Sequence, residues 1–387
     1  MKVDFDAVAR ALRPKYSRFV REDRVLLTGH SHQAWPDVAR DAQLRAFDDA
    51  ANLVDNKWGP ALAVADRVRA GIASRIGAHA DEIAFSPNTH ELVVRFLSTV
   101  DLKSRPRLVT TGGEFHSMRR QLARLSEEGI EVVWVEPAPL ETLAERLAGA
   151  VDDRTAAVLA STVLFGSSGV VPNLRAVSDR AERHGAAVLF DAYHAFNVVP
   201  FSVSDLGEHA FVVAGGYKYA QFGEGVCFLR VPSGRTHRPV NTGWFADFTH
   251  LASPRADGPV PYGPRGADQF AGSTYDPVSH YRAAAVLDFF DTEGLTVERL
   301  RAISLAQTDH LLAGLADHDI VTPKDAALRG GFVAVRVGDA TKVLEGLRAR
   351  NVFADARGDI VRFGPAPYLT CADLDAGLAA FRDANRR

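Results

Sequence analysis

Hydrophobic positions along the middle of the chain alternate between two periods. Short runs rich in Val, Ala, Leu and Phe are apolar at most positions, and the intervals between them carry apolar residues at helical spacing. Strands that are apolar throughout and separated by amphipathic helices are typical of a mainly parallel sheet covered on both faces. The predicted strands span 107–110, 131–135, 156–161, 186–190, 211–214 and 226–229, and the predicted helices between them include 118–128, 140–150 and 174–184.

The two ends of the chain follow different patterns. Helical spacing runs from 41 to 76, with the turn Trp58-Gly59-Pro60 inside it. A Pro- and Gly-rich loop covers roughly 232–276. Beyond that loop the pattern predicts helices over 281–290 and 297–315, strands over 332–337 and 360–363, and a final helix from residue 372. We therefore predict an arm (1–40), a large α/β domain (41–280) and a small C-terminal α+β domain (281–387).

Composition and charge exclude several classes of protein. The 387 residues are 47% hydrophobic and 24% charged, which is ordinary for a globular protein and excludes a largely disordered chain. The net charge of −3 gives no sign of a nucleic-acid or membrane partner. Cys227 and Cys371 are too few for a disulfide framework or a structural zinc site. Because no signal-peptide core or membrane span is visible, we expect a cytoplasmic protein.

Lysine is rare in this chain, so its position is informative. The sequence has seven lysines among 45 basic residues. Lys218 follows the apolar strand 211–214 and the segment Gly215-Gly216-Tyr217. Asp191 directly follows the strand 186–190. Reactive groups of open α/β sheets gather beyond the carboxyl ends of the strands, so we expect both side chains to face one crevice.

This amine and this carboxylate together suggest a particular chemistry. Taken alone, Asp191 reads equally well as a turn or cap residue, and Lys218 as a lysine that reaches solvent. An amine desolvated in an apolar setting has a lowered pKa and can form a Schiff base. A carboxylate at a neighbouring strand end can pair with a protonated ring nitrogen. Pyridoxal phosphate enzymes require this pair of groups.

Three motifs carry a family resemblance that extends, in order, from about residue 25 to 370. They are Asp191-Ala192-Tyr193-His194, Gly216-Tyr217-Lys218-Tyr219 and Arg362-Phe363-Gly364-Pro365. They resemble the signatures of the class V aminotransferase family of fold-type-I pyridoxal phosphate enzymes, and within it those of kynureninases. The resemblance implies a transferase-like α/β fold whose large domain binds pyridoxal 5'-phosphate and whose N-terminal arm contributes to the active site. Lys218 and Asp191 would then be the catalytic residues.

The resemblance also assigns cofactor-binding residues. Asn88 and Thr89 precede a helical pattern and would bind the phosphate, although an ordinary helix cap explains them equally well. Phe115 would stack on the cofactor ring, where core packing is the alternative. The remaining implied contacts are His194 near the phenolic oxygen, Tyr217 on the phosphate, and Ser273 on the phosphate of a neighbouring subunit. The last implies a homodimer with shared active sites.

Substrate contacts follow the same family pattern, with one departure. Arg362 would bind the carboxylate of an amino-acid substrate bidentately, and Trp244 would form an aromatic wall. Kynureninases usually have Gly-Asn-Ser-Leu-Gly where this chain has Gly29-His30-Ser31-His32. We therefore expect His30 and His32 to line a polar substrate loop. The alternative, half of a metal site, lacks an accompanying ligand cluster, and no metal is expected.

Three functions remain open on the sequence alone. A kynureninase-like hydrolase or lyase that cleaves an amino-acid side chain and a class V aminotransferase rank nearly equal. A non-enzymatic binding module is disfavoured, because Asp191, Lys218 and Arg362 are all intact. Desulfurase chemistry is disfavoured as well, because the loop 364–368 carries no cysteine.

Overall fold

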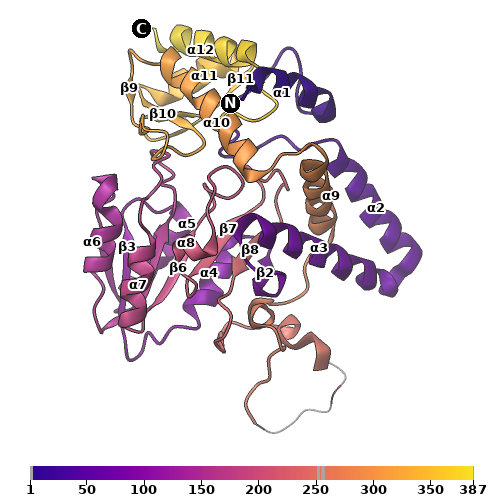
Figure 1. The fold of residues 1–387 in the computed structure, drawn as a ribbon, viewed down its shortest axis with the longest axis vertical. Helices are drawn as coiled ribbons and strands as arrows, with labels where there is room; N and C mark the ends of the chain where they lie inside the picture. The colour runs from indigo at the N-terminus through magenta and orange to yellow at the C-terminus, as the bar shows by residue number, and fades with distance from the viewer. Residues whose placement is uncertain (1–2, 251–252, 254–257, 387) are drawn as a thin grey trace.

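The computed structural model describes residues 3–250, 253 and 258–386, and it is built around a seven-stranded sheet (Figure 1). The strands lie in the order β2-β8-β7-β6-β5-β3-β4. Neighbours from β7 to β4 are parallel, and β8 is antiparallel to both β7 and β2. Their bounds are β2 Ile83–Ser86, β3 Arg107–Thr111, β4 Glu131–Val135, β5 Thr155–Ser161, β6 Ala187–Asp191, β7 Phe211–Gly215 and β8 Cys227–Arg230. The predicted α/β class with a mainly parallel sheet is confirmed, and six of these strands fall where the apolar runs predicted them.

Helices cover both faces of this sheet. Successive residues of a strand point to opposite faces, and apolar side chains on both faces need a covering layer. In β6, Val188 and Phe190 belong to one hydrophobic cluster and Leu189 to another. Each cluster is therefore the core of one face. The first cluster includes residues of α3 Trp58–Ile76, α6 Leu143–Gly149 and α7 Arg175–Arg183, and the second includes residues of α4 Thr89–Leu97 and α5 His116–Glu127.

The turn predicted at Trp58-Gly59-Pro60 is wrong in its position. Helix α2 spans Val38–Leu53, and the chain turns through the short 3-10 helix η2, Val54–Lys57. Trp58 then opens α3, which puts Pro60 in the first helical turn. A proline is tolerated there, because its missing N–H would have no partner within the helix in any case.

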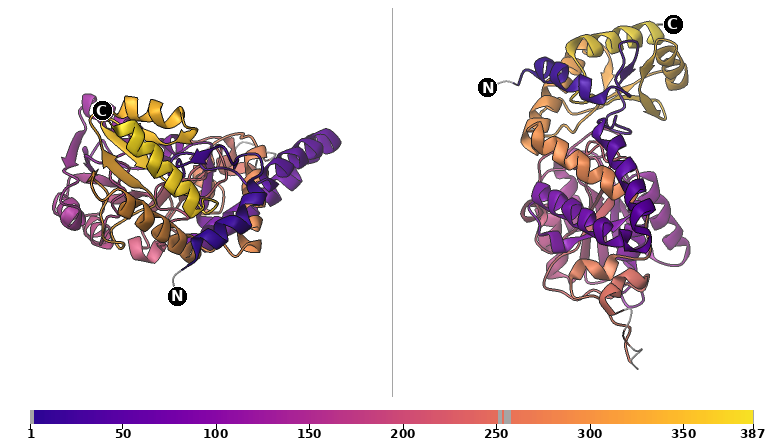
Figure 2. Two further views of the ribbon diagram at one scale, coloured as in Figure 1. Left: turned by 90° about the horizontal axis from the view of Figure 1, so that it is seen from above. Right: turned by 90° about the vertical axis from the view of Figure 1, so that its right-hand side faces the viewer.

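A second, smaller sheet lies at the C-terminal end of the chain (Figure 2). Its four antiparallel strands have the order β12-β13-β10-β9. Their bounds are β9 Asp319–Ile320, β10 Val333–Arg336, β12 Asp355–Arg357 and β13 Ile360–Phe363. The helices of this region are α10 Val297–Gly314, α11 Ala340–Arg348 and α12 Cys371–Asn385. This agrees with the small α+β unit expected after the large sheet.

The N-terminal segment packs against this C-terminal part. β1 Val25–Leu26 pairs in parallel with β11 Val352–Phe353, and Thr28 forms a bridge with Gly364. Helix α1, Phe5–Leu12, lies beside the same region (Figure 2). Helix α9, Val278–Thr292, contacts α2 and α3, so the boundary that we set after residue 280 falls inside a helix that contacts the N-terminal helices.

Of the predicted loop 232–276, residues 251–252 and 254–257 lie outside the described residues. The rest contains two short 3-10 helices, η5 Trp244–His250 and η6 Gly266–Phe270. No helix in the described part of the chain has both the length and the apolar character needed to cross a membrane.

Candidate active site

The carboxyl ends of β6 and β7 bring the predicted amine and carboxylate to one edge of the large sheet. Asp191 is the last residue of β6, and Lys218 follows β7 after a tight turn. A side chain at Gly215 would place its Cβ 2.2 Å from the Tyr193 hydroxyl oxygen, and one at Gly216 would meet Phe222 at 2.6 Å. Glycine at both positions lets the backbone turn closely enough to bury Lys218, whose exposed fraction is 6%.

The amine of Lys218 lies among aromatic rings. Its Nζ is 2.8 Å from Nε2 of His194, and the ring centroids of Tyr193 and Phe115 are 4.5 and 5.4 Å away. Burial lowers the pKa of Lys218 to about 7, against the opposing effect of Asp191. Much of this amine is therefore neutral at pH 7, as a nucleophilic lysine requires.

Asp191 and His194 complete the immediate surroundings of the amine. Burial raises the pKa of Asp191. Two effects oppose this shift: the backbone N–H of Tyr193 donates to Oδ1 at 2.8 Å, and Lys218 contributes a positive charge. Burial and the Lys218 amine hold the pKa of His194 well below its ordinary value. Nδ1 of His194 is buried and has no hydrogen-bond partner among the described residues. Such atoms are rare in folded proteins, so this one fits a polar atom of a bound group.

Glu114 is a further buried carboxyl that the sequence analysis did not assign to the site. It accepts hydrogen bonds from the backbone N–H of Ser161 at 2.9 Å and from its hydroxyl at 2.6 Å. Burial raises the pKa of Glu114 to about 8, and the nearby charge of Asp191 contributes in the same direction. Its position directly before Phe115, beyond the end of β3, was the available signal.

The residues predicted to bind phosphate lie at the start of α4. Oδ1 of Asn88 accepts the N–H of Glu91 at 3.0 Å and so caps the helix, in which Thr89 is the first residue. A cavity of about 220 Å³ at this helix start is lined by Asn88 and Ser273, among others. N–H groups at a helix start attract anions, and Arg95 also lines the cavity, but so does the carboxylate of Glu91. Thr89, Tyr217 and Lys218 are not among the residues that line it.

Tyr217 and Trp244, two of the predicted aromatic contacts, differ in their surroundings. Tyr217 packs against Tyr193, with 5.0 Å between ring centroids, and stacks on His32 at 5.3 Å, close to the amine. Trp244 is 43% exposed, stacks on Phe245 and donates from Nε1 to the hydroxyl of Thr274 at 3.2 Å. The described contacts of Trp244 do not include Lys218 or Arg362, so one chain alone does not bring it to the amine.

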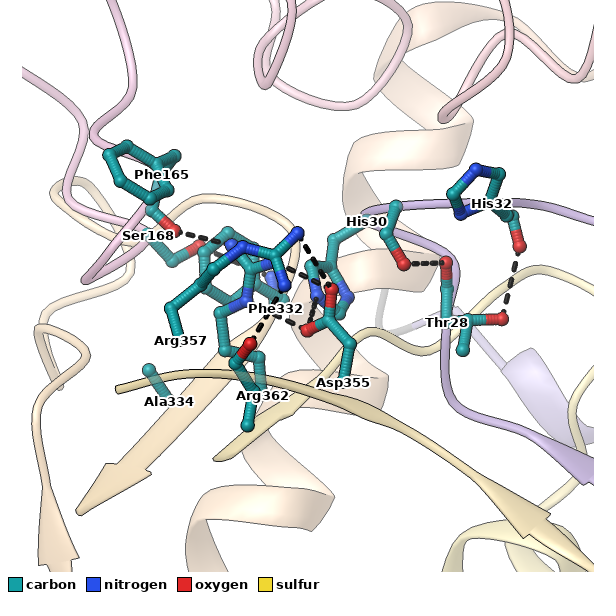
Figure 3. Close-up of polar contacts among 12 residues, drawn as sticks. Thr28, His30, His32, Phe165, Ser168, Phe332, Ala334, Asp355, Arg357 and Arg362 are labelled. Carbon is teal, nitrogen blue, oxygen red and sulfur yellow. Dashed lines mark hydrogen bonds and ion pairs between the residues drawn. The ribbon is translucent and has the colours of Figure 1, made fainter. Parts of the chain in front are cut away.

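Arg362 is buried, and a carboxylate that the sequence analysis missed already binds it (Figure 3). Nε and Nη2 donate to Oδ1 and Oδ2 of Asp355 at 2.8 and 2.6 Å. Nη1 donates to the backbone carbonyl of Phe165 at 2.7 Å. Asp355 and Arg362 are directly opposite each other on β12 and β13. The strand β12 was not predicted, because three residues in a turn-rich segment give no periodic signal.

The two histidines of the predicted substrate loop have separate partners (Figure 3). His30 is buried, and its Nε2 lies 2.8 Å from Oδ1 of Asp355. Burial lowers the pKa of His30 to about 4, although Asp355 opposes that shift. His32 is exposed and stacks on Tyr217. The described residues contain no group of three or more His, Cys, Asp or Glu side chains that could hold a metal ion.

Neither cysteine is placed as an exposed nucleophile. Cys227 is buried in β8, with its Sγ 3.7 Å from the Tyr193 hydroxyl, and burial raises the pKa of its thiol. Cys371 begins α12, and its pKa is also raised by burial. A raised pKa keeps both thiols protonated near neutral pH.

Solved structures similar to this chain share its fold. The cystine C–S lyase C-DES, in a mutant with glycine covalently linked to the PLP cofactor, superposes with a TM-score of 0.82 at 17% identity, covering 96% of this chain and 99% of that one. A cysteine desulfurase from Thermococcus onnurineus NA1 gives a TM-score of 0.78 at 16% identity, covering 100% and 98%. The fold is that of the fold-type-I pyridoxal phosphate-dependent enzymes.

Comparisons of sequence identify the family. The model of the kynureninase C-terminal domain matches residues 300–381. The kynureninase of Salinispora tropica is 30% identical, and the match covers 92% of this chain and 89% of that protein. That of Deinococcus radiodurans is 29% identical and covers 83% and 79%, and the uncharacterized aminotransferase YcbU of Bacillus subtilis is 23% identical and covers 86% of each. The chain belongs to the kynureninase family, and it is a pyridoxal phosphate-dependent enzyme of the class V type.

Proposed function

We propose that this enzyme hydrolyses the Cβ–Cγ bond of an amino acid whose side chain carries a carbonyl at Cγ, as kynurenine does. Water supplies a hydroxyl to Cγ, which becomes a carboxylic acid, and Cβ takes up a proton, which leaves alanine. The observation that carries the proposal is the buried amine of Lys218, with a pKa lowered to about 7, beside Asp191 and His194 in a kynureninase-family chain.

The described residues fit pyridoxal phosphate. Lys218 would hold its aldehyde, Asp191 would pair with its ring nitrogen, and the partnerless Nδ1 of His194 offers a polar contact to it. The ring centroid of Phe115 lies 5.4 Å from the Lys218 amine, and this ring would stack on the cofactor ring. When bound, the cofactor supplies an electron sink that stabilises negative charge at Cα of the substrate.

The protein's own groups then handle the substrate's protons and its carboxylate. Nζ of Lys218, once neutral, takes the proton from Cα, and the ring nitrogen of His194 at 2.8 Å orients the amine for that transfer. Arg362 binds the substrate carboxylate through the N–H groups that Asp355 and Phe165 leave free. Burial of these groups excludes bulk water from the amine.

We also propose that two copies of the chain share their active sites. Asn88, Thr89 and Tyr217 would bind the phosphate in one subunit. Ser273, which within one chain lines the same cavity as Asn88, would reach the phosphate of the partner subunit. Exposed apolar side chains support a contact between copies. They include Trp244 and Phe248 in η5, and Leu44 and Phe47 on α2. Trp244 would then form an aromatic wall of the partner's substrate site.

The rival function is transamination, which the similarity to YcbU favours. The two reactions leave different products. Hydrolysis releases alanine in many turnovers and leaves the cofactor unchanged, whereas transamination without a 2-oxo acid stops after one equivalent of pyridoxamine phosphate.

The experiment incubates the loaded enzyme with kynurenine and no 2-oxo acid, and quantifies alanine and pyridoxamine phosphate by mass spectrometry. We expect alanine in large molar excess over enzyme. Lys218→Ala should release none, and Lys103→Ala, which changes an exposed lysine, should match the wild type. One equivalent of pyridoxamine phosphate without alanine would refute hydrolysis and establish the rival.

A further inference from the structure

The side chain proposed to bind the substrate carboxylate already binds a carboxylate of the protein, and this arrangement requires an explanation. Asp355 binds two donors of Arg362, the residue to which the proposed function assigns the substrate carboxylate. Either the substrate displaces Asp355, or Asp355 stays and prepares Arg362 for binding. The geometry of the cluster in Figure 3 distinguishes these two cases.

The guanidinium retains donors for a second carboxylate. It has five N–H groups, and among the described residues one from Nε, one from Nη2 and one from Nη1 are used. One N–H on Nη1 and one on Nη2 therefore remain. The bond from Nη1 to the carbonyl of Phe165 and the two bonds to Asp355 fix the plane of the group, which fixes the direction of these two N–H groups.

Asp355 is itself held in place on several sides. It lies directly opposite Arg362 in the β12–β13 ladder, and Nε2 of His30 lies 2.8 Å from its Oδ1. His30 is enclosed in turn: a side chain at Gly364 would put its Cβ 2.2 Å from Nδ1 of His30. Displacement by substrate would leave a half-buried carboxylate with His30 and the more distant Arg357 as its described partners, at a large cost in free energy.

The cluster stands next to the reacting groups. Phe332 contacts the rings of His30 and His194, with centroid separations of 4.6 and 5.7 Å, and the Arg362 guanidinium carbon lies 5.4 Å from its centroid. His194 binds the Lys218 amine. Phe332 therefore contacts both the arginine and the side chain that lies against the amine, which places the Asp355–Arg362 cluster beside the reacting groups.

The side chains of the cluster carry a net positive charge that one bound anion would neutralise. Nη2 of Arg357 lies 3.7 Å from Oδ2 of Asp355, so two guanidinium groups face one carboxylate. Although burial opposes ionisation, His30 and Arg362 hold the pKa of Asp355 far below its ordinary value, and it is charged at neutral pH. His30 is neutral there, because burial lowers its pKa to about 4. The net charge of +1 matches a single substrate carboxylate.

We propose that Asp355, held by His30, is a positioning residue that orients Arg362 so that its two free N–H groups bind the substrate carboxylate. This inference rests on the proposed function, in which Arg362 binds that carboxylate. It adds Asp355 and His30 as specificity-determining residues. It also gives a role to the histidine that stands where kynureninases usually have asparagine, since either side chain can donate an N–H to Asp355.

The test measures binding without turnover. The ligands are 4-oxo-4-phenylbutanoate, which is kynurenine without its two amino groups, and the corresponding amide, and both are titrated calorimetrically into the loaded enzyme. For Asp355→Asn we expect about tenfold weaker binding of the acid, equivalent to ~1.4 kcal/mol, and unchanged binding of the amide. Asp359→Asn, which removes an exposed carboxylate from the same hairpin, should bind both ligands as the wild type does.

Three results would overturn the proposal. Unchanged binding of the acid by Asp355→Asn means that Asp355 does not position Arg362, and tighter binding means that Asp355 competes with the substrate. Equal binding of acid and amide by the wild type means that Arg362 is not a carboxylate receptor. Alanine release is measured separately, so Asp355-dependent binding without alanine would refute the proposed function alone.

A second pair of variants keeps the test valid if Asp355→Asn does not fold. His30→Leu removes the donor to Asp355, and His30→Asn retains one. We expect His30→Leu to bind the acid about threefold more weakly and His30→Asn to bind it like the wild type. With kynurenine, His30→Leu should raise KM and leave kcat within about twofold, a split that general destabilisation does not produce. Equal acid binding by both variants would contradict the role of His30.

Discussion

Burial sets the protonation states of the ionisable side chains around Lys218. It lowers the pKa of Lys218 to about 7 and that of His30 to about 4, and it raises that of Glu114 to about 8. Each shift favours the neutral form, as removal from water requires. The sequence could place Lys218 and Asp191 at neighbouring strand ends, but it could not predict how deeply Glu114 and His30 are buried.

The lowered pKa of Lys218 can be measured by chemical labelling of the cofactor-free protein. Only the neutral amine reacts, so the rate at Lys218 should reach half of its maximum near pH 7. In urea-unfolded protein the same lysine should show its ordinary pKa of 10.5. Brief acetylation across a pH series, read by peptide mass spectrometry, provides the measurement. A half-maximum above pH 9 in the folded protein would contradict the assigned environment.

The buried imidazole of His30 predicts a loss of stability in mild acid. Between pH 6.5 and about 4 the unfolded chain binds a proton at His30 and the folded chain does not, so stability falls as the pH falls through that window. At pH 5 the loss from this one residue is about 2 kcal/mol relative to pH 7. Urea unfolding of wild type and His30→Asn at both pH values isolates it. A difference between the two proteins that does not change with pH would exclude the effect.

At the scale of elements, a buried ion pair fixes the edge of the large sheet. Nε and Nη2 of Arg230, at the end of β8, donate to the carboxylate of Glu82, which precedes β2, at 3.2 and 3.0 Å. Nη1 of the same arginine donates to the backbone carbonyls of Glu208 and Ala210. The pair thus connects β8, its neighbour β2 and the segment that leads into β7.

Removal of one partner should show how much the Glu82–Arg230 ion pair contributes to the free energy of unfolding. Glu82→Ala leaves the guanidinium of Arg230 buried without its carboxylate, and we expect unfolding free energy to fall by about 3 kcal/mol. Glu128→Ala, which breaks an exposed pair with Arg124, should cost less than about 1 kcal/mol. Urea denaturation followed by circular dichroism measures both. Equal losses would show that burial of the Glu82–Arg230 pair adds nothing.

Elements were predictable where one physical signal dominated. The strands β3 to β8 are apolar on both faces, so their runs stand out from the sequence. β2, Ile83–Ser86, was not predicted, because its three apolar residues lie directly before the helical pattern of α4 and cannot be distinguished from the start of a helix. β12 owes its existence to pairing with β13, and the local sequence contains no trace of that contact.

At the scale of the whole molecule, contacts between distant segments complete the candidate site. His30 and Asp355 are 325 residues apart in the chain and meet through the pairing of β1 with β11. Family motifs predicted Lys218, Asp191, His194 and Arg362 as site residues. In the structure His194 lies 2.8 Å from the Lys218 amine, and the charges of Asp191 and Arg362 influence the pKa of that amine. The partner of Arg362 could not be predicted, because neither spacing nor composition indicates which carboxylate faces an arginine across a hairpin.

The proposed dimer belongs to this scale and has its own test. Phe47 on α2 is 70% exposed, which is costly for a large apolar side chain unless another surface covers it. Phe47→Arg should therefore produce monomers that bind the cofactor more weakly, as measured by light scattering and cofactor absorbance. Glu127→Arg, a charge change on the exposed side of α5, should remain dimeric. A monomeric wild type would refute the shared site.

The attachment of the N-terminal segment to the C-terminal sheet has a consequence for engineering. Thr28 bridges Gly364, so the loop that carries His30 is fastened to the strand region that carries Arg362. If the small sheet shifts toward Lys218, then His30, Asp355 and Arg362 travel together and keep their mutual spacing. A tag or truncation that disturbs the first 30 residues would therefore alter substrate affinity before it altered the chemistry at the amine.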